Sequence, residues 1–525
     1  MGSDAGSPHE ETTRLDDGLL LIGAKLALRR LRMPRIQGTE GQTPCTSRGA
    51  SGSLKQVSFL ATTVMTHHHS PWRARTPGTL IAALLWWSTG LGGVVFAADQ
   101  PIAILHAHDE TFQQVAGYVC DLAKQGYSHV QIAPPQKSSD ASNAWFMRYQ
   151  PVDYLVIEGR GSAADLKALT SKAHGCGMKV IADVVLNHMS SNPNYKNLTY
   201  PTFSAQDFHR PCTIDYSDGN TRSERNCWLN DDLPDLDQSK ANVATIQKQH
   251  LQLLVDLGVD GFRFDAAKHM DPSVVADYIS YANRITANKA WNYLEVVNDQ
   301  DTNASMYTPI AAVTDFVLCD AMKNAFSFGG SLSSLRLPQA INDSRSVTFG
   351  VNHDTDPQIN PGFPKCQYTN RSDAVLADAY VLARASGTPL ILAKDNLAVP
   401  YLPTGVQFRK IISARAREGL NVKENGLAVL DPQNVLLMER GSEGFFVVNK
   451  GAGAVDVPML DLTLTNLDGC YRELRNNFTV AIERRPDNKK YVTRWGSWNR
   501  GGLQIQGRDA LYFVREPFSL CSSHS

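Results

Sequence analysis

Residues 261–269 read Gly-Phe-Arg-Phe-Asp-Ala-Ala-Lys-His, a short β-rich run that ends in charged side chains. Because side chains alternate along a strand, Arg263 and Asp265 lie on the same face. A charged pair that points into a protein interior is costly unless it is matched or used. The stretch therefore predicts a buried strand whose carboxyl end carries functional side chains.

Similar runs recur along the chain, and helical stretches separate them. The stretches 162–177 and 373–386 carry apolar residues at three- and four-residue spacing, which is typical of helices that cover a sheet. This alternation predicts a (β/α)8 TIM barrel, with an open doubly wound sheet as the alternative. The expected strands are 102–105, 129–132, 179–185, 261–265, 293–297, 315–319, 347–351 and 389–392.

Two parts of the chain depart from this alternation. The crossover after the third strand is long and rich in Asn, Asp, Ser and Pro, and structureless loops of such length are uncommon. We therefore expect a small inserted subdomain at about 189–240, within a barrel that spans 98–420. The alternation stops after Gly419, and short strands predict a separate antiparallel β domain over 421–525.

Composition and charge exclude several classes of protein. Hydrophobic residues make up 42% and charged residues 20% of the chain, as in globular proteins, which excludes wholesale disorder, collagen and coiled coil. The 51 Lys and Arg nearly cancel the 52 Asp and Glu, so no global field draws the protein to nucleic acid or anionic lipid. We expect no nucleic-acid partner.

An apolar run at 79–97 has the features of an export signal. Arg73 and Arg75 precede it, and it ends in the small-residue pattern Val-Phe-Ala. We expect a signal peptide at 65–97 and a secreted or periplasmic protein without membrane contact after cleavage; an uncleaved anchor helix is the alternative. Residues 1–64 are expected to be a polar leader, disordered or a mis-assigned start, although their basic residues would also suit a helix at a membrane surface.

Four of the expected strand ends carry acidic or amide side chains. The strands of a parallel barrel point the same way, so these ends meet on the face where barrel enzymes have their sites. A single acidic strand end is typically a solvated loop residue, but four in successive order argue against that interpretation. The segments are Asp-Val-Val-Leu-Asn-His at 183–188, residues 261–269, Tyr-Leu-Glu-Val-Val-Asn-Asp at 293–299 and Asn-His-Asp at 352–354.

These four segments resemble the signature regions of the α-amylase family of glycoside hydrolases. Trp-Phe-Met-Arg-Tyr-Gln-Pro at 145–151 resembles the segment that supplies a sugar-stacking tyrosine, and Leu-Pro-Asp-Leu-Asp at 233–237 resembles a motif of the inserted domain. The match covers nearly the whole chain after the signal. It implies a barrel with an inserted domain after the third strand and a C-terminal β-sandwich.

The resemblance implies that Asp265 is the nucleophile, Glu295 the general acid/base and Asp354 the carboxylate that stabilises the transition state. A retaining glycosidase attacks the anomeric carbon with one carboxylate while a second, protonated carboxyl donates to the leaving oxygen. Arg263 would keep Asp265 ionised, because a neighbouring cation favours the charged form. Glu295 must instead stay protonated near neutral pH, through burial or a nearby negative charge.

Substrate contacts also follow from the resemblance. His188 and His353 match positions that hydrogen-bond the reacting sugar, and Tyr149 matches the stacking tyrosine. Either histidine could instead be a satisfied buried side chain, and the tyrosine could be plain core. The substrate-binding residues expected are Tyr149, His188, Arg263, Lys268, His269 and His353.

A calcium site is a further implication, because Ca²⁺ prefers several oxygen ligands and suits a joint between two domains. The side chains of Asn187 and Asp235 and the backbone carbonyls near Arg225 and His269 would bind it. The alternative is that Asn187 and Asp235 only hydrogen-bond loops. Chloride is not expected. Arg263 and Asn352 match a chloride site known in the family, but the third, basic position falls on Leu390, with Lys394 a few residues away.

Cysteine pairing is expected once the leader is removed. Of nine cysteines, only Cys45 lies before residue 98, and the even number left in an exported chain favours disulfides. Relatives often have a bridge that matches the first of the expected pairs. We expect Cys212 with Cys227, Cys470 with Cys521, Cys120 with Cys176 and Cys319 with Cys366.

The function that these features imply is that of an exported, monomeric, endo-acting α-amylase. It would hydrolyse internal α-1,4 bonds of starch-like α-glucans with retention of configuration. The alternatives are a related glucan enzyme, which transfers the glycosyl unit or prefers maltooligosaccharides, cyclodextrins or pullulan, and a non-catalytic carbohydrate-binding barrel. The last alternative would be expected to lack a carboxylate, and all three are present.

Overall fold

A computed structural model describes residues 100–191, 198–217, 219–336, 341, 345–457, 459–460, 466–495 and 503–522. The leader expected at 1–64 and the signal peptide expected at 65–97 lie outside these residues. Within them, no helix has the length and apolar character that crossing a membrane requires.

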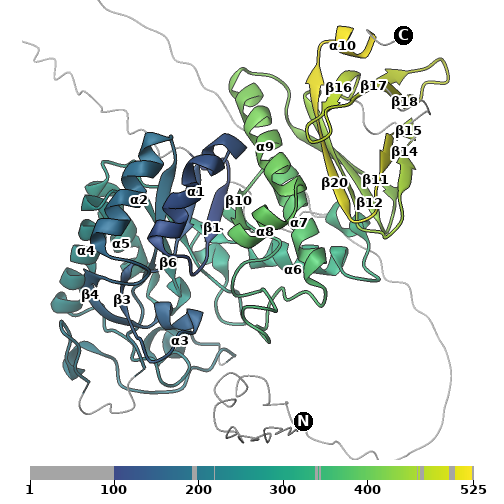
Figure 1. The fold of residues 1–525 in the computed structure, drawn as a ribbon. Coiled ribbons are helices and arrows are strands. Elements are labelled where there is room, and N and C mark those ends of the chain that lie inside the picture. Colours follow the sequence, from purple (N-terminus) through teal and green to yellow (C-terminus); the bar gives the residue numbers. More distant parts are fainter. Residues whose placement is uncertain are drawn as a thin grey trace, which may run out of the picture. The chain divides into compact units, whose positions relative to one another are not determined.

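Eight parallel strands close into a barrel (Figure 1). The first strand, β1, pairs with β2 on one side and with β10 on the other, so the sheet has no open edge and the doubly wound alternative is wrong. In the register of β5 and β6, Asp183 lies beside Arg263 and Val185 beside Asp265. In order around the barrel the strands are β1 (Ile104–Ala107), β10 (Thr388–Leu392), β9 (Ser346–Thr348), β8 (Ala312–Thr314), β7 (Tyr293–Leu294), β6 (Gly261–Asp265), β5 (Lys179–Val185) and β2 (His129–Ile132).

Helices between the strands bury their apolar sides in the same core as the barrel. Their starts follow local capping chemistry: Thr111 and Ser162 each accept a hydrogen bond from the third residue of the helix that follows. The helices are α1 (Phe112–Gln125), α2 (Ala163–Gly175), α4 (Ala241–Asp256), α5 (Pro272–Ile285), α6 (Phe316–Phe326), α7 (Arg371–Ala383), α8 (Ala393–Ala398) and α9 (Tyr401–Arg417).

The sixth strand differs from the sequence-based expectation. Residues 315–319 were expected to form it, but the strand is β8, Ala312–Thr314, and α6 begins at Phe316. Asp315 ends the strand because its side chain accepts a hydrogen bond from the backbone N–H of Leu318 at 2.9 Å and thereby caps the helix. The apolar run Phe-Val-Leu-Cys that follows is a helical turn that is buried except for Val317, and periodicity cannot distinguish it from a strand over so few residues.

The long crossover between β5 and α4 contains little regular structure. It carries the short helix α3 (Thr221–Asn226), and isolated bridges pair His188 with Asp235 and Phe208 with Leu236. A hairpin of β3 (Gln136–Ser138) and β4 (Pro151–Ile157) precedes it. The limits 189–240, 98–420 and 421–525 remain predictions.

The C-terminal strands form an eight-stranded antiparallel sheet and a two-stranded ribbon. One face of the sheet packs with the ribbon in a core that includes Leu437, Phe513 and Leu503. The opposite face joins the core of the barrel, and Tyr512 donates a hydrogen bond to the carbonyl of Ala379 in α7 at 3.0 Å. The sheet runs β11 (Glu424–Asp431), β12 (Val435–Arg440), β13 (Gly444–Asn449), β20 (Asp509–Glu516), β16 (Gly469–Glu473), β17 (Thr479–Arg484), β18 (Lys490–Trp495) and β15 (Met459–Leu460), and the ribbon is β14 (Val455–Val457) with β19 (Leu503–Ile505); helix α10 (Ser519–Ser522) follows.

Four disulfides join the eight cysteines after residue 98, and all four expected pairs are confirmed. The bridges are Cys120–Cys176, Cys212–Cys227, Cys319–Cys366 and Cys470–Cys521.

Candidate active site

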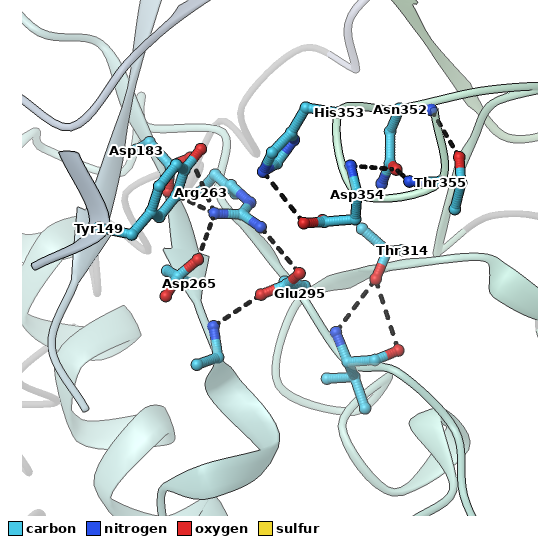
Figure 2. Close-up of polar contacts among 12 residues, drawn as sticks. Tyr149, Asp183, Arg263, Asp265, Glu295, Thr314, Asn352, His353, Asp354 and Thr355 are labelled. Carbon is cyan, nitrogen blue, oxygen red and sulfur yellow. Dashed lines mark hydrogen bonds and ion pairs between the residues drawn. The ribbon is translucent and has the colours of Figure 1, made fainter. Parts of the chain in front are cut away.

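Acidic side chains meet at the carboxyl ends of the barrel strands (Figure 2). Asp183 lies on β5, Asp265 is the last residue of β6, and Glu295 follows β7 directly. Asp354 comes from the segment after β9. These positions are consecutive or nearly so around the barrel, so the topology brings together residues that are far apart in sequence.

Arg263 joins three of these carboxyls. Its guanidinium lies 2.7 Å from Asp183 Oδ1 and 2.7 Å from Asp265 Oδ1 through Nη1, and 3.0 Å from Glu295 Oε1 through Nη2. Only 3% of Arg263 is exposed, so water cannot replace these partners. Figure 2 shows the carboxyl groups of Asp183, Asp265 and Glu295 turned toward this one cation.

Burial and mutual repulsion change the acidity of this group. Burial raises the pKa of Asp183 to about 6 and raises the pKa of Asp265 well above its usual range, despite the attraction of Arg263. For Asp354, burial and the nearby Glu295 raise the pKa well above its usual range. One guanidinium cannot hold four neighbouring carboxyls ionised.

Glu295 differs from the expectation that it stays protonated. Burial alone would raise its pKa, but Arg263 and the backbone N–H of Ala266 outweigh burial and lower it. That N–H donates to Glu295 Oε2 at 2.8 Å. In the free protein Arg263 and this N–H therefore favour the ionised form of Glu295, whereas burial disfavours the ionised forms of Asp265 and Asp354.

Backbone-directed hydrogen bonds hold two of the carboxyls in place. Asn352 Oδ1 accepts from the backbone N–H groups of Asp354 at 3.0 Å and Thr355 at 2.9 Å, which fixes the turn that carries Asp354. Thr314 Oγ1 accepts from the N–H of Val296 at 3.0 Å, directly after Glu295 (Figure 2). Both contacts orient acidic side chains without touching them.

Aromatic rings lie beside the carboxyls. Tyr149 donates to Asp183 Oδ2 at 3.0 Å, and its ring stacks on His353 with centroids 5.4 Å apart and an angle of 11°. Trp145 meets both rings edge-on. His353 Nε2 lies 3.4 Å from Asp354 Oδ1. The rings form an aromatic cluster next to charged groups, a combination that suits a sugar.

The other expected substrate-binding residues already have partners. His188 Nε2 lies 3.0 Å from the carbonyl of Tyr149, and His269 Nδ1 lies 2.9 Å from the carbonyl of Glu224. Lys268 is paired with Asp299, and its ammonium group lies over the ring of Tyr216. Each of these residues lies near the strand ends and already has a partner in the free protein.

Two of the expected calcium ligands lie together. The backbone N–H of Leu236 donates to the carbonyl of Asn187, and Asp235 pairs with the next residue, His188. Asn187 Oδ1 and Asp235 Oδ1 are buried and lack a hydrogen-bond partner among the described residues. Burial raises the pKa of Asp235 to about 7. Buried oxygens without partners are the donors that a hard cation requires, so these residues fit calcium.

The remaining expected calcium ligands lie on two neighbouring segments. Arg225 is in α3, and His269 ends the turn Ala267–His269 after β6. The hydrogen bond from His269 to the carbonyl of Glu224 joins the two segments. This bond holds the backbone of the two segments beside one another.

Lys394, the alternative third residue of a chloride site, lies on α8. Its ammonium group is 2.7 Å from Asp356 Oδ2, which also accepts from Arg371. Leu390 lies within β10. Chloride independence remains a prediction.

Sequence reasoning missed two features of the site. Asp183 was recognised as an acidic strand end but not as the buried partner of Arg263, although its place one strand away could have indicated it. His106 and His108, which lie against His353, had no motif to identify them.

Proteins similar in sequence to this chain include α-amylases. An α-amylase of Aeromonas hydrophila is 32% identical over 401 residues, covering 66% of this chain and 84% of that protein. The chain belongs to the α-amylase family. An α-amylase of Thermomonospora curvata is 29% identical over 458 residues, covering 77% of this chain and 74% of the relative, and the α-amylase catalytic-domain family model matches residues 121–323.

Solved structures agree at the level of fold. The maltohexaose complex of α-amylase I from Eisenia fetida has a TM-score of 0.65 at 21% identity, covering 78% of this chain and 98% of that one. An α-amylase from Malbranchea cinnamomea has a TM-score of 0.62 at 19% identity, covering 81% and 97% of the two chains. This member of the α-amylase family is an enzyme of the glycoside hydrolase class.

Proposed function

We propose that this enzyme hydrolyses internal α-1,4-glucosidic bonds of starch-like α-glucans with retention of configuration. The observation that carries the proposal is the shared contact of Asp265 and Glu295 with Arg263, next to Asp354. Two carboxyls held close to one another are what double displacement requires, since one attacks the sugar and the other transfers a proton.

The first displacement forms a bond between Asp265 and the anomeric carbon and breaks the glycosidic bond. Glu295 gives its proton to the leaving oxygen. Water then attacks the anomeric carbon, Glu295 takes the proton from that water, and the bond to Asp265 breaks. Asp354 stabilises the positive charge that develops on the sugar in both transition states.

The proton that Glu295 donates comes from within the group of carboxyls. In the free protein Arg263 lowers the pKa of Glu295, whereas burial and the nearby Glu295 raise the pKa of Asp354 well above its usual range. A glucan that enters between these groups excludes water and places the leaving oxygen against Glu295. We assign to Asp354 the role of proton reservoir for Glu295 as the substrate binds.

The aromatic cluster of Trp145, Tyr149 and His353 supports an α-glucan as the substrate. Tyr149 and His353 would contact the sugar whose bond is cleaved, with Arg263 and His188 behind them. Lys268 and His269, on the turn after β6, would contact the sugar on the leaving side. The related Eisenia fetida structure holds maltohexaose, an oligosaccharide of this class.

Calcium belongs to the proposal as a structural ion. Asn187 and Asp235 would bind it through side-chain oxygens, and Arg225 and His269 through backbone carbonyls. When bound, the ion supplies positive charge for buried oxygens and joins the inserted segment to the barrel; it takes no part in bond cleavage. We propose no chloride requirement.

Export fits the cysteine chemistry. Four disulfides are typical of a chain that folds outside the reducing cytosol. We propose that the protein is secreted or periplasmic after removal of the signal at 65–97, and that it works as a monomer.

The test is the product profile on soluble starch, with anomers followed by NMR from the first minutes. The proposal expects a mixture of maltooligosaccharides that appear first as α-anomers. Initial β-anomers would contradict retention. Larger or cyclic products, or cleavage confined to short oligosaccharides, would identify a transglycosylase or a different glucan hydrolase, and no turnover in the intact enzyme would identify a binding protein.

A further inference from the structure

Three histidines lie together near the carboxyl ends of the barrel strands. His106 is in β1, His108 follows that strand, and His353 follows β9. One ring nitrogen from each lies within 4.8 Å of the other two. The rings of His106 and His353 are 5.0 Å apart, and those of His108 and His353 are 4.8 Å apart. The mechanism proposed above uses only His353.

Several nitrogens of this histidine cluster have no hydrogen-bond partner among the residues that the structure describes. Only 1% of His106 and 3% of His353 is exposed. Both ring nitrogens of His106, and Nδ1 of His353, are buried without a partner in the described part of the chain. Buried polar atoms are normally satisfied, so these unpaired nitrogens require an explanation.

The partner of His353 adds a second, independent observation. Its Nε2 lies 3.4 Å from Asp354 Oδ1, so the other ring nitrogen, Nδ1, is the one left free. Histidines that bind metals commonly donate their second N–H to a carboxylate, which fixes the ring and makes it a better ligand. Asp354 stands in that position.

The chemical state of the rings also suits a metal. A metal binds only neutral imidazole. Burial lowers the pKa of His108 to about 4 and lowers the pKa of His106 and of His353 well below the usual value of a histidine. His108 is partly exposed, which gives access from solvent. Tetrahedral zinc at about 2.0–2.1 Å from nitrogen requires nitrogens about 3.3 Å apart. The rings of His108 and His353 are stacked at an angle of 21°, so the partly exposed His108 must turn out of this stack for both rings to bind one ion.

We propose that His106, His108 and His353 bind a divalent transition metal of the zinc type, with water in the open fourth position. The bound metal and a glucan exclude each other, because His353 is stacked on Tyr149 and faces Asp354. The site is distinct from the calcium ligands, which are oxygens. Competition with glucan rests on the proposed function, whereas metal binding does not.

Zinc binding is measured directly by isothermal titration of the full chain, without an affinity tag and with calcium in excess. The sequence also contains three histidines at 67–69, which could bind zinc themselves. All proteins compared keep these three residues, so the test is the difference in zinc stoichiometry between them. His174→Gln is the control, because His174 lies in α2 and not in the histidine cluster. The parent and this control should each bind one more zinc per chain than a variant that carries both His106→Gln and His108→Gln. Equal zinc stoichiometry and affinity in all three would overturn the proposal.

Cobalt replaces zinc as a spectroscopic probe of the same site. Tetrahedral cobalt with three nitrogen ligands absorbs strongly in the visible region. The parent should show this absorption, and in a His108→Gln variant the absorption should be reduced or shifted. Circular dichroism verifies that each variant is folded. If His106→Gln disturbs folding, His108→Gln alone decides, because its side chain is partly exposed.

The activity measurement is independent of the binding measurement. Zinc should inhibit starch cleavage competitively, and the zinc concentration for half inhibition should rise by about tenfold or more in His108→Gln, relative to that variant's own zinc-free rate. Zinc binding without competition would refute the coupling to the active site but not the metal site. An enzyme inactive on starch would contradict the proposed function, and the zinc stoichiometry would still test the metal site.

Discussion

Arg263 decides the acid-base behaviour of the site, because the carboxyls around it share one positive charge. Asp265 must be ionised to attack the sugar, and burial raises its pKa. Activity should therefore fall as the pH falls through that raised value. We expect the acid limb of the kcat/KM profile, which reports the free enzyme, to lie above the usual carboxyl range near pH 4.

Asp183→Asn tests this prediction, since it removes a negative charge that raises the pKa of Asp265 and leaves Arg263 with one charged partner fewer. The acid limb should move to lower pH. Asp315→Asn is the matched control, because it alters a buried aspartate that does not contact Arg263 and keeps a good helix cap. An acid limb that moves upward, or stays fixed, would show that Asp265 does not set it.

At the scale of elements, the end of β8 and the start of α6 depend on Asp315. Its Oδ1 accepts from Leu318 and its Oδ2 from the N–H of Ile341 at 3.3 Å. Asp315→Ala should lower the free energy of unfolding by about 1–2 kcal/mol, and Asp315→Asn by much less, because asparagine also caps helices. Equal losses in urea titrations of the two variants would contradict the capping role.

The calcium joint is the second element-scale prediction. A chelator should lower the melting temperature, since calcium bound only to the folded state contributes about 2.7 kcal/mol at a hundredfold excess over Kd. Asp235→Asn should lose most of this sensitivity, whereas Asp232→Asn, an exposed control in the same segment, should keep it. Chelator-insensitive melting of the parent, with no metal by elemental analysis, would refute the site.

The same joint should depend on pH. Without calcium, the raised pKa of Asp235 stabilises the fold below the unfolded value near 4, and this stabilisation is lost as the pH rises through about 7. Calcium must displace that proton, so its protection should be larger at pH 8 than at pH 6. Differential scanning calorimetry with and without chelator measures the difference; the reverse order would count against Asp235 as a ligand.

Most strands could be predicted from the sequence, because their apolar runs are short and bounded by turns. The acidic strand ends could be predicted because recognisable motifs contain them. The sixth strand could not be placed, since Phe316 to Cys319 are apolar whether extended or helical. The pairing of Glu295 with Arg263 depends on the register of separate strands, and the contact of His106 with His353 depends on closure of the barrel. Neither is encoded locally.

At the scale of the whole molecule, Lys450 links the C-terminal sheet to the barrel. Its ammonium group donates to the carbonyls of Ala325, Ser327 and Gly330 at 2.8, 3.0 and 2.7 Å, near the end of α6. Lys450→Met would leave these carbonyls without their donor and should cost about 1–3 kcal/mol or more. Lys423→Met, at an exposed position, is the control, and equal melting temperatures would show that the link is not stabilising.

The barrel and one face of the C-terminal sheet share a continuous core, so the two should unfold together. The catalytic geometry then depends on the intact chain, and within it two residues have separate roles. Asp265 is proposed to form the covalent bond, and Glu295 is proposed to move the proton.

The most direct test compares Asp265→Asn and Glu295→Gln on two substrates, starch and a maltosyl fluoride, whose leaving group needs no proton. Glu295→Gln should lose several orders of magnitude in kcat on starch but far less on the fluoride, because only protonation of the leaving group is impaired. Asp265→Asn should be disabled on both. Equal losses of Glu295→Gln on the two substrates, or near-normal turnover by Asp265→Asn, would contradict the assignment.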